Sequence, residues 1–331
     1  MKKLVLVDGN AIVHRAYHAL PPLNKTADGQ LTNAVYGFFS MVLKITGDLN
    51  PDHLIVCFDR AAPTFRKQMF SGYQATRPKM DDGLSGQFKI IHEVLEKIKV
   101  CIFELDGYEA DDLIGTLARQ AIGKQTTDHS KKAVDSSLKA VDQVIILTGD
   151  RDMLQLVNPQ VLILAPIIGV TKMILFDPEK VKEKYGVEAS NFVDYKALIG
   201  DSSDNYPGVG GIGPKTAMDL VNKFGSLENI YENLGEINPK TMEKLATDAE
   251  QAAMAKKLAT IEVNAPVHIK FEDCEVTKIN RGALLSSFQE LDFNSLIARF
   301  KLDVKPSAAA KVKADKKVKQ EQEKENQLGL L

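Results

Sequence analysis

Short apolar runs alternate with helical patterns over the first half of the chain. The runs are rich in valine, leucine and isoleucine and comprise Leu4–Val7, His53–Phe58, Val100–Leu105 and Val144–Leu147. Runs of this kind are typical of buried parallel strands. Apolar residues recur at helical spacing between them, over Ala11–Leu20, Ala34–Ile45 and Gln87–Ile98. The alternation predicts a doubly wound, mostly parallel α/β sheet.

The pattern changes in the second half. Val161–Ala165 and Lys172–Phe176 predict two more strands, and helical patterns dominate from about Val181 onward. Asn191–Ile199 and Pro214–Phe224 predict two helices, separated by a polar turn and a glycine-dense hairpin. We therefore predict an α/β core at residues 1–177 and a helical domain at residues 178–303.

Two segments have no clear pattern. Gly123–Asp142 is rich in Lys, Ser, Thr and Asp and predicts a surface insertion. Residues 304–331 form a low-complexity tail of Ala, Lys, Glu and Gln, which predicts disorder.

Composition narrows the class of protein. The chain has 331 residues, 44% hydrophobic content and a net charge of -2, so any basic surface must be local. Its three cysteines are far apart and form no finger or disulfide pattern, which favours a reducing compartment. No stretch approaches the length of a membrane span. We expect a cytoplasmic, monomeric protein.

Acidic residues gather where apolar runs stop. Glu109, Asp111 and Asp112 precede an apolar helical pattern, and by themselves they are better explained as the acidic first turn of a helix. The wider set weakens that explanation, because parallel strands bring their carboxyl ends to one edge. Its members are Asp8, Asp59, Glu109, Asp111, Asp112, Asp150, Asp152, Asp201 and Asp204.

Crowded carboxylates repel one another and raise one another's pKa unless cations relieve them. Mg²⁺ and Mn²⁺ prefer oxygen ligands, and two such ions can support an in-line phosphoryl displacement. The six histidines are scattered, so metal-activated water is the natural nucleophile. The acids therefore predict a two-metal hydrolytic site.

Two further segments suggest contact with phosphates. Arg60–Met80 carries many cations interleaved with aromatics, which fits a solvated loop and a phosphate-gripping arch about equally. The hairpin Gly208–Gly213 lets the backbone approach a phosphate, with Lys215 in the helix that follows. A glycine cluster alone is more often a plain turn, but this one directly follows Asp201 and Asp204.

At this point the chain resembles the 5′-nuclease family, in particular the 5′→3′ exonuclease domain of bacterial DNA polymerase I, which is similar to flap endonucleases. The resemblance covers residues 2 to 303. It rests on Leu-Val-Asp8-Gly, Tyr36-Gly-Phe, Phe58-Asp59, Phe65-Arg66, Gly-Tyr-Glu109-Ala-Asp111-Asp112, Thr-Gly-Asp150-Arg-Asp152, Gly-Asp201-Ser-Ser-Asp204-Asn and Pro-Gly-Val-Gly-Gly-Ile-Gly-Pro-Lys. No polymerase sequence follows, so we expect a stand-alone enzyme.

The resemblance implies a PIN-like nuclease core with an arch at about residues 60–80 and a helix–hairpin–helix at 192–224. It implies a first metal on Asp8, Asp59, Glu109 and Asp111, and a second on Asp111, Asp150, Asp152 and Asp204, with Asp112 and Asp201 supporting the site. Arg15, Arg66 and Arg77 would grip the scissile region and Tyr73 would stack there. Lys67, Gln74, Gly208, Gly210, Gly211, Gly213, Lys215 and Thr216 are the expected DNA contacts, with a K⁺ ion at the hairpin.

One position departs from the family. Bacterial relatives usually carry Tyr-Lys in the arch, where this chain has Tyr73-Gln74. A neutral amide stabilises charge building on a phosphate less well than an ammonium group. Turnover would be slow unless Lys67, Arg77 or Lys79 substitutes.

The end of the tail resembles the short peptide that bacterial proteins insert into the sliding clamp. The candidate anchors are Gln327, Leu328, Leu330 and Leu331. An uncapped apolar C-terminus is the alternative explanation, but the position of these residues at the end of a charged linker favours the clamp-binding peptide.

Three functions are open at this stage. The first is a metal-dependent 5′→3′ exonuclease and flap endonuclease acting on branched or nicked duplex DNA. The second is a flap or junction binder with weak or lost catalysis, suggested by Gln74. The third is a small-molecule phosphatase, which explains Asp8 and Asp150 but neither the arch nor the hairpin.

Overall fold

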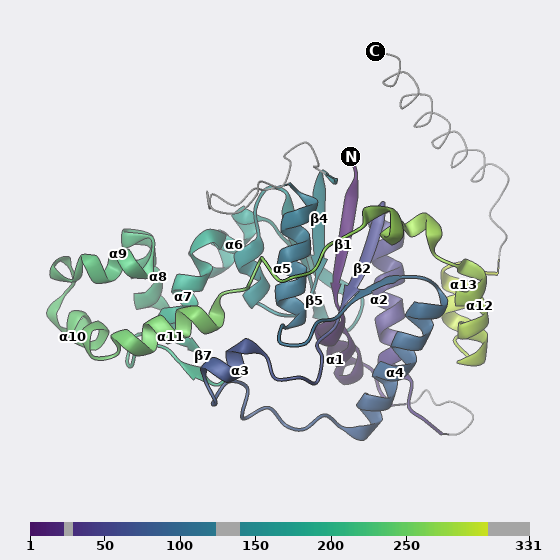
Figure 1. Cartoon of the computed structure of the whole chain (residues 1–331), viewed down its shortest axis with the longest axis horizontal. Coiled ribbons are helices and arrows are strands. Elements are labelled where there is room, and N and C mark those ends of the chain that lie inside the picture. Colours follow the sequence, from purple (N-terminus) through teal and green to yellow (C-terminus); the bar gives the residue numbers. More distant parts are fainter. Residues whose placement is uncertain (23–28, 124–139, 304–331) are drawn as a thin grey trace, which may run out of the picture. The chain divides into compact units, whose positions relative to one another are not determined.

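A mostly parallel sheet of six strands lies at the centre of the chain, in the order β3-β2-β1-β4-β5-β6 (Figure 1). A computed structural model describes residues 1–22, 29–123 and 140–303. The strands are β1 (Lys3–Asp8), β2 (His53–Cys57), β3 (Cys101–Phe103), β4 (Gln143–Leu147), β5 (Val161–Ile168) and β6 (Lys172–Phe176). All neighbouring pairs are parallel except β5 and β6, which confirms the predicted sheet.

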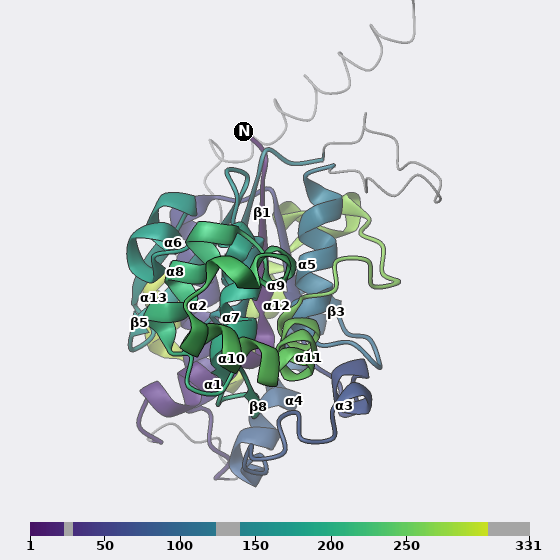
Figure 2. The same ribbon diagram turned by 90° about the vertical axis from the view of Figure 1, so that its left-hand side faces the viewer.

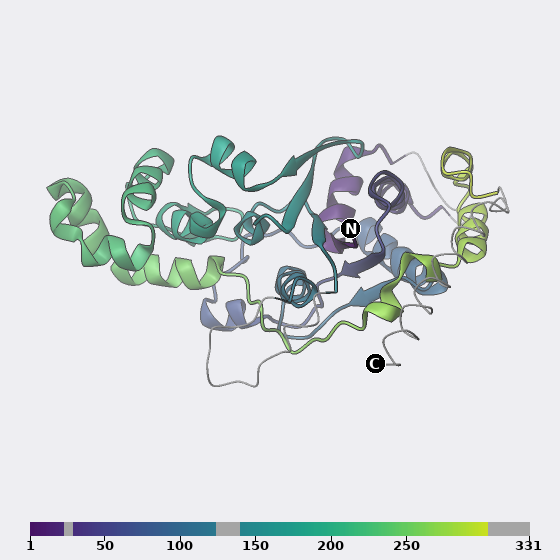
Figure 3. The ribbon, with the colours of Figure 1, turned by 90° about the horizontal axis from the view of Figure 1, so that it is seen from above.

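Helices cover both faces of this sheet. The helices α1 (Gly9–Ala19), α2 (Asn33–Leu49) and α4 (Asp82–Lys97) pack together on one face, and α5 (Ala110–Ala121) lies on the other (Figure 3). Right-handed crossovers explain the division, because the chain runs from β1 to β3 in one direction and returns across the sheet to β4. The direction changes between β1 and β4, which makes their carboxyl ends a switch point.

The helical part follows β6 and comes to the front in Figure 2. It consists of α6 (Pro178–Tyr185), α7 (Phe192–Ile199), α8 (Pro214–Phe224), α9 (Leu227–Glu232), α10 (Pro239–Thr247) and α11 (Ala249–Ala259). α7 is central, because it packs on both α8 and α11 and buries Phe192 and Leu198. The short strands β7 (Gly200–Asp201) and β8 (Tyr206–Pro207) pair between α7 and α8.

The segment 60–80 contains a short helix, α3 (Phe65–Met69), which its few helical signals did not predict. Its aromatic side chains pack inward. Phe65 contacts Tyr108 edge-to-face, and Phe70 lies against the main core. Both rings are half-buried and each has protein contacts, so stacking of bases on them stays a prediction.

The chain divides into two compact units, Met1–Ile279 and Asn280–Leu331. The second contains α12 (Arg281–Glu290) and α13 (Asn294–Arg299), joined by contact between Phe288 and Phe293. The 3-10 turns are η1 (Asp152–Leu156), η2 (Ala189–Asn191), η3 (Leu234–Glu236), η4 (Phe271–Cys274) and η5 (Val276–Lys278). Among the described residues, no helix has the length and hydropathy to cross a membrane.

Some predictions fall outside the described residues. These are most of the insertion at Gly123–Asp142 and the whole tail, including the clamp-binding candidates Gln327, Leu328, Leu330 and Leu331. The three cysteines are described, and all are free thiols.

Candidate metal centre and nucleic-acid interface

The acids that follow the strands converge at the switch point. Asp8 ends β1, Asp59 follows β2 and Asp150 follows β4, while α5 begins directly after Glu109. Together with Asp111 and Asp204 they line a pocket of about 700 Å³. The predicted convergence is therefore present, because the carboxyl ends of parallel strands meet at this edge.

Asp8 is held rigidly at the base of the pocket. One carboxylate oxygen caps α1 by accepting from the Ala11 amide at 2.9 Å, and the other accepts from the Thr148 hydroxyl at 2.6 Å. Burial raises the pKa of Asp8 to about 7 against these hydrogen bonds, and the charges of Asp59 and Asp150 add to the shift.

Asp111 carries the least relieved charge. No hydrogen bond to its carboxylate comes from any residue that the structure describes. Burial raises its pKa well above the usual range, and the charges of Asp150, Asp8 and Asp59 raise it further. An anion so placed needs either a proton or a cation.

Glu109 is oriented by three donors. It accepts from Thr64 at 3.1 Å, from Arg66 at 3.3 Å and from the Tyr73 hydroxyl at 3.1 Å. Burial raises its pKa to about 7 despite the charge of Arg66.

The Tyr73 hydroxyl also lies 3.3 Å from Asp204, so it bridges two carboxylates of the pocket. Its side chain is only 3% exposed. This differs from the expected stacking role, because the ring is enclosed by the protein. Burial and the charge of Glu109 raise the pKa of Tyr73, so the group stays protonated and donates.

Arg66 and Asp112 form a buried ion pair outside the pocket. The guanidinium donates to both oxygens of Asp112, at 2.7 and 2.8 Å, and to the carbonyls of Leu258 at 2.9 Å and Thr260 at 2.7 Å. With the bond to Glu109, each of its five N–H groups has a partner. Arg66 has no donor left for a phosphate, which differs from its expected role.

Asp112 also accepts from the amides of Glu109 and Glu262, so it fixes the start of α5 and is not turned to the pocket. Successive helical residues point about 100° apart, and this rotation separates Asp111 from Asp112.

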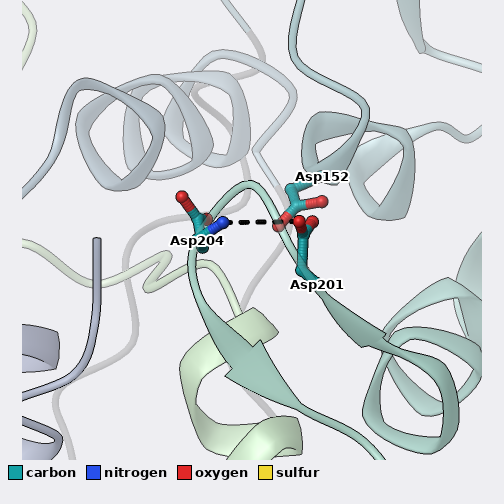
Figure 4. Close-up of side chains that lie close together, drawn as sticks. All are labelled: Asp152, Asp201 and Asp204. Atoms are coloured by element: carbon teal, nitrogen blue, oxygen red, sulfur yellow. Dashed lines mark hydrogen bonds between the residues drawn. The ribbon is translucent and has the colours of Figure 1, made fainter. Parts of the chain in front are cut away.

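A second acidic group lies beside the pocket. Ligand oxygens of Asp152, Asp201 and Asp204 lie within 4.8 Å of one another. Figure 4 shows Asp152 and Asp201 facing each other with Asp204 alongside, and the dashed line joins the Asp204 amide to Asp201 at 3.4 Å.

Lys196 of α7 lies within this group and was not predicted. Its ammonium contacts Asp152 at 2.6 Å and forms a short contact with Asp201. Burial alone would raise the pKa of Asp201, but the hydrogen bond and charge of Lys196 outweigh it and lower that pKa. Burial raises the pKa of Asp152 to about 7 in spite of Lys196. The sequence feature that could have indicated this role is the presence of one lysine, Lys196, in the otherwise mostly apolar helix α7.

The predicted cations separate into two groups. Arg77 contacts Asp204 at 2.6 Å, and Lys67 lines the pocket with an exposed side chain. Gln74 also lines the pocket and donates weakly to Asp204 at 3.4 Å. Arg15 lies elsewhere, because its guanidinium donates to the carbonyls of Ile167 at 2.7 Å and Gly169 at 3.2 Å and so fixes the β5–β6 turn.

The glycine hairpin stands on two buried anchors. Val209 and Ile212 are 3% and 5% exposed, whereas the backbone at Gly210, Gly211 and Gly213 and the side chain of Lys215 face solvent. A Cβ on Gly208 would lie 2.3 Å from the Leu198 carbonyl, so only glycine fits there. Thr216 is half-buried in the first turn of α8.

The residues present fit hard divalent cations. The donors are carboxylates with raised pKa, the chemistry that Mg²⁺ and Mn²⁺ select. The buried hydroxyl of Tyr206 has no hydrogen-bond partner among the described residues and lies in the field of Asp152, Asp201 and Asp204. A hydrated cation beside it would supply that partner.

With this geometry established, comparison with known families is decisive. A model of the 5′-3′ exonuclease N-terminal resolvase-like domain matches residues 3–186, and one of the 5′-3′ exonuclease C-terminal SAM fold matches residues 187–282. The chain belongs to the 5′-3′ exonuclease family. The resemblance inferred from the motifs is therefore confirmed.

Curated relatives support the assignment. DNA polymerase I of Bacillus subtilis (strain 168) is 40% identical over 299 residues, which cover 90% of this chain and 32% of the relative. DNA polymerase I of Lactococcus lactis subsp. cremoris (strain MG1363) is 37% identical over 305 residues, covering 91% and 33%. The chain thus spans about a third of the length of these relatives.

Solved structures confirm the fold class. T5 5′-exonuclease with bound zinc superposes with a TM-score of 0.62 at 20% identity, covering 88% of this chain and 98% of that one. The catalytic core of Rad2 in complex with DNA substrate gives a TM-score of 0.54 at 17% identity, covering 87% of each. The core and the helical region that follows it therefore share the fold of these two proteins.

Proposed function

We propose that this protein is a divalent-metal-dependent 5′→3′ exonuclease and 5′-flap endonuclease, which hydrolyses DNA or RNA-primer phosphodiesters in replication and repair. The observation that carries the proposal is the position of Asp111, a half-buried carboxylate that accepts no hydrogen bond from the described residues and lies in the field of Asp8, Asp59 and Asp150. That arrangement is costly without cations and suited to holding them.

We assign the metal ligands as the family resemblance implies. Asp8, Asp59, Glu109 and Asp111 would hold one Mg²⁺ or Mn²⁺, and Asp111, Asp150, Asp152 and Asp204 a second. Bound divalent cations would supply Lewis acidity at the phosphate and a water of lowered pKa. Asp201 and Asp112 already have amide and cationic partners, so we assign them to orienting the site.

The remaining groups orient these ligands and attract the substrate. Thr148 fixes Asp8, and Tyr73 fixes Glu109 and Asp204. Lys67 and Arg77 place positive charge at the pocket, where a phosphate would enter. The hairpin and the first turn of α8 would hold a duplex backbone without reading bases, with Lys215 and Thr216 beside them.

The test is incubation with a labelled 5′-flap duplex and Mg²⁺. We expect release of the flap or of short 5′ fragments, and loss of that release with a chelator or in Asp111→Ala. Tight flap binding without cleavage would instead establish the DNA-binding alternative that Gln74 suggests. Turnover of a small phosphate ester alone would establish the phosphatase.

We also propose a K⁺ ion at the hairpin and a sliding clamp as partners of this protein. The carbonyls of the hairpin would bind K⁺, which predicts tighter duplex binding in potassium than in tetramethylammonium salts. Docking of Gln327–Leu331 on a sliding clamp predicts that deleting this segment abolishes clamp association and leaves cleavage of bare DNA unchanged. Free cysteines and bacterial relatives favour the cytoplasm, and we propose a monomer.

A further inference from the structure

Three side chains at the junction of α10 and α11 grip the backbone of the glycine hairpin. The Lys244 ammonium donates to the Gly211 carbonyl at 2.8 Å, and Asp248 accepts from the Gly210 amide at 2.7 Å. Gln251 donates to the Gly208 carbonyl. We call Lys244, Asp248 and Gln251 the hairpin brace.

The hydrogen-bond partner of Asp248 is unusual for a residue at the start of a helix. It occupies the N-cap of α11, where an aspartate ordinarily accepts from amides of its own first turn. Its side chain makes no such bond and instead reaches the Gly210 amide, 38 residues earlier in the chain. Helix α11 therefore lacks a side-chain cap from Asp248, and the carboxylate holds the hairpin instead.

The charge of Asp248 is also unexpected. Lys215 and the exposed amides beside it form a surface suited to phosphate, and a carboxylate next to that surface opposes an approaching DNA backbone. A carboxylate serving only as a surface charge would weaken binding. The Gly210 N–H is already donated to Asp248, so it is not itself a phosphate donor. The presence of the acid is explained if holding Gly210 presets the neighbouring backbone for the duplex and this contributes more to binding than the charge removes.

The local geometry shows what would be fixed. Gly211 has a φ of +72°, and a Cβ there would lie 2.8 Å from the Lys244 ammonium. The brace thus packs directly on the one residue of the hairpin in the left-handed region. Three hydrogen bonds thus hold Gly208, Gly210 and Gly211 before any ligand binds, which lowers the cost of ordering the turn on binding.

We propose that the hairpin brace positions the backbone of residues 208–213 for a phosphate of duplex DNA, with Asp248 as its principal member. This inference rests on the proposed function. It assigns no contact with DNA to Asp248, which acts through Gly210. It predicts that removing this acid weakens DNA binding, the opposite of the result expected for a simple negative charge.

Two substitutions separate the hydrogen bond from the charge. Asp248→Ala removes both, and we expect about tenfold weaker binding of a nicked duplex, the effect of about one lost hydrogen bond. Asp248→Asn keeps an acceptor oxygen and removes the charge, so we expect affinity equal to or tighter than that of the parent. Affinity is measured with Ca²⁺ in place of Mg²⁺, and KM and kcat with Mg²⁺.

Glu250→Ala is the matched control, because Glu250 is an exposed acid in the first turn of α11, two residues from Asp248, and is not one of the three brace side chains. We expect it to leave affinity unchanged or to tighten it slightly. A structural role alone would lower kcat in step with stability, whereas positioning raises KM about tenfold and leaves kcat and the melting temperature near the parent values.

Gln251→Leu tests the brace without any change of charge and carries the test if Asp248→Ala fails to fold. We expect it to weaken duplex binding about fivefold through loss of the bond to Gly208. Tighter binding by Asp248→Ala, or parental affinity in Gln251→Leu, would overturn the inference. Flap cleavage by the parent protein in Mg²⁺ separates this failure from failure of the proposed function, since cleavage without the expected changes in affinity would overturn the inference alone. Parental affinity in Lys215→Ala would also overturn it, because the hairpin would then not bind DNA.

Discussion

The acid pocket and the glycine hairpin are built in opposite ways. In the pocket, Asp8 and Glu109 have pKa values raised to about 7, and Asp111 has no donor among the described residues. In the hairpin, the Gly208 and Gly211 carbonyls and the Gly210 amide each have a hydrogen-bond partner in the hairpin brace. The pocket is incomplete without a ligand, whereas the hairpin is already in place.

In the acid pocket, the groups proposed for function lower the stability of the fold. In the hairpin, the same contacts serve both stability and the proposed DNA binding. Like charges in the pocket disfavour the folded chain, so a bound cation should stabilise it. The hairpin is stabilised by its own protein contacts, which also prepare it for DNA. Substitutions in the pocket should therefore trade activity for stability, while substitutions at the hairpin should lose affinity.

The largest expected effect comes from Asp111→Asn. Removing the least relieved carboxylate should reduce cleavage of a 5′-flap duplex by roughly a thousandfold, because both proposed metal positions lose a ligand. The same change should raise the melting temperature in chelator, because it removes mutual repulsion with Asp8, Asp59 and Asp150. Flap cleavage and thermal unfolding measure the two outcomes.

Glu96→Gln is the control for Asp111→Asn, because Glu96 is an exposed acid on α4. Glu96→Gln should change neither the rate of flap cleavage nor the melting temperature in chelator. A lower melting temperature for Asp111→Asn in chelator would show that Asp111 stabilises the fold, and the contrast between the pocket and the hairpin would then be lost.

Arg66→Ala should have the next largest effect, on stability. It leaves Asp112 buried without its cation and releases the carbonyls of Leu258 and Thr260. Loss of one partner of a buried pair costs about 3–5 kcal/mol. Arg60→Ala, which breaks the exposed pair with Asp106, should cost about 0–1 kcal/mol. Denaturant unfolding measures both, and similar values would place Arg66 among ordinary surface cations.

The pH dependence of stability should change with metal. Asp8, Glu109 and Asp152 have folded pKa values raised to about 7, above their usual 3.8 or 4.5. A raised pKa favours the protonated folded form, so this stabilisation is complete below about pH 4 and is lost as pH rises through about 7.

In chelator, the melting temperature should therefore fall by several degrees between about pH 5 and about pH 8. Mg²⁺ should reverse the fall at the upper end, because the ion replaces the protons. A melting temperature that rises with pH in chelator would contradict the raised pKa values.

The sequence predicted the pocket because the position of its acids depends on the order and direction of the strands. Asp8, Asp59 and Asp150 follow apolar runs, and a parallel sheet must bring such positions to one edge. Residue type and spacing alone could not distinguish Asp111 from Asp112, because both are acids at the same helix start, and only the family resemblance assigned them different roles. Only the rotation of α5 turns one to the pocket and the other to Arg66.

The roles that the sequence missed depend on contacts between distant segments. Arg66 reaches carbonyls 192 and 194 residues away, and the Tyr73 hydroxyl meets Asp204 across 131 residues. Motif matching assigned both to the substrate, because a motif records residue type and not direction. Lys196 and the hairpin brace have no motif, so their partners became visible only in the folded chain.

The smallest expected effect tests the one departure from the family pattern. Gln74 has a φ of +53°, its backbone amide bonds the Asp204 carbonyl at 2.9 Å, and its side chain donates only weakly to Asp204. Gln74→Lys adds a positive charge at the pocket without changing the backbone requirement, since neither residue is glycine. We expect kcat on a 5′-flap substrate to rise about threefold to tenfold through stabilisation of charge on the phosphate.

Gln68→Lys adds the same charge at an exposed position of α3 and should change only salt-dependent affinity. A rise in kcat confined to Gln74→Lys would mean that the pocket lacks one cation near the reacting phosphate. Equal gains in both variants, expressed in KM, would mean that long-range attraction is the limiting quantity. The added lysine would then act as the hairpin does, on binding alone, and the division of labour between the two regions would be sharper than the family pattern implies.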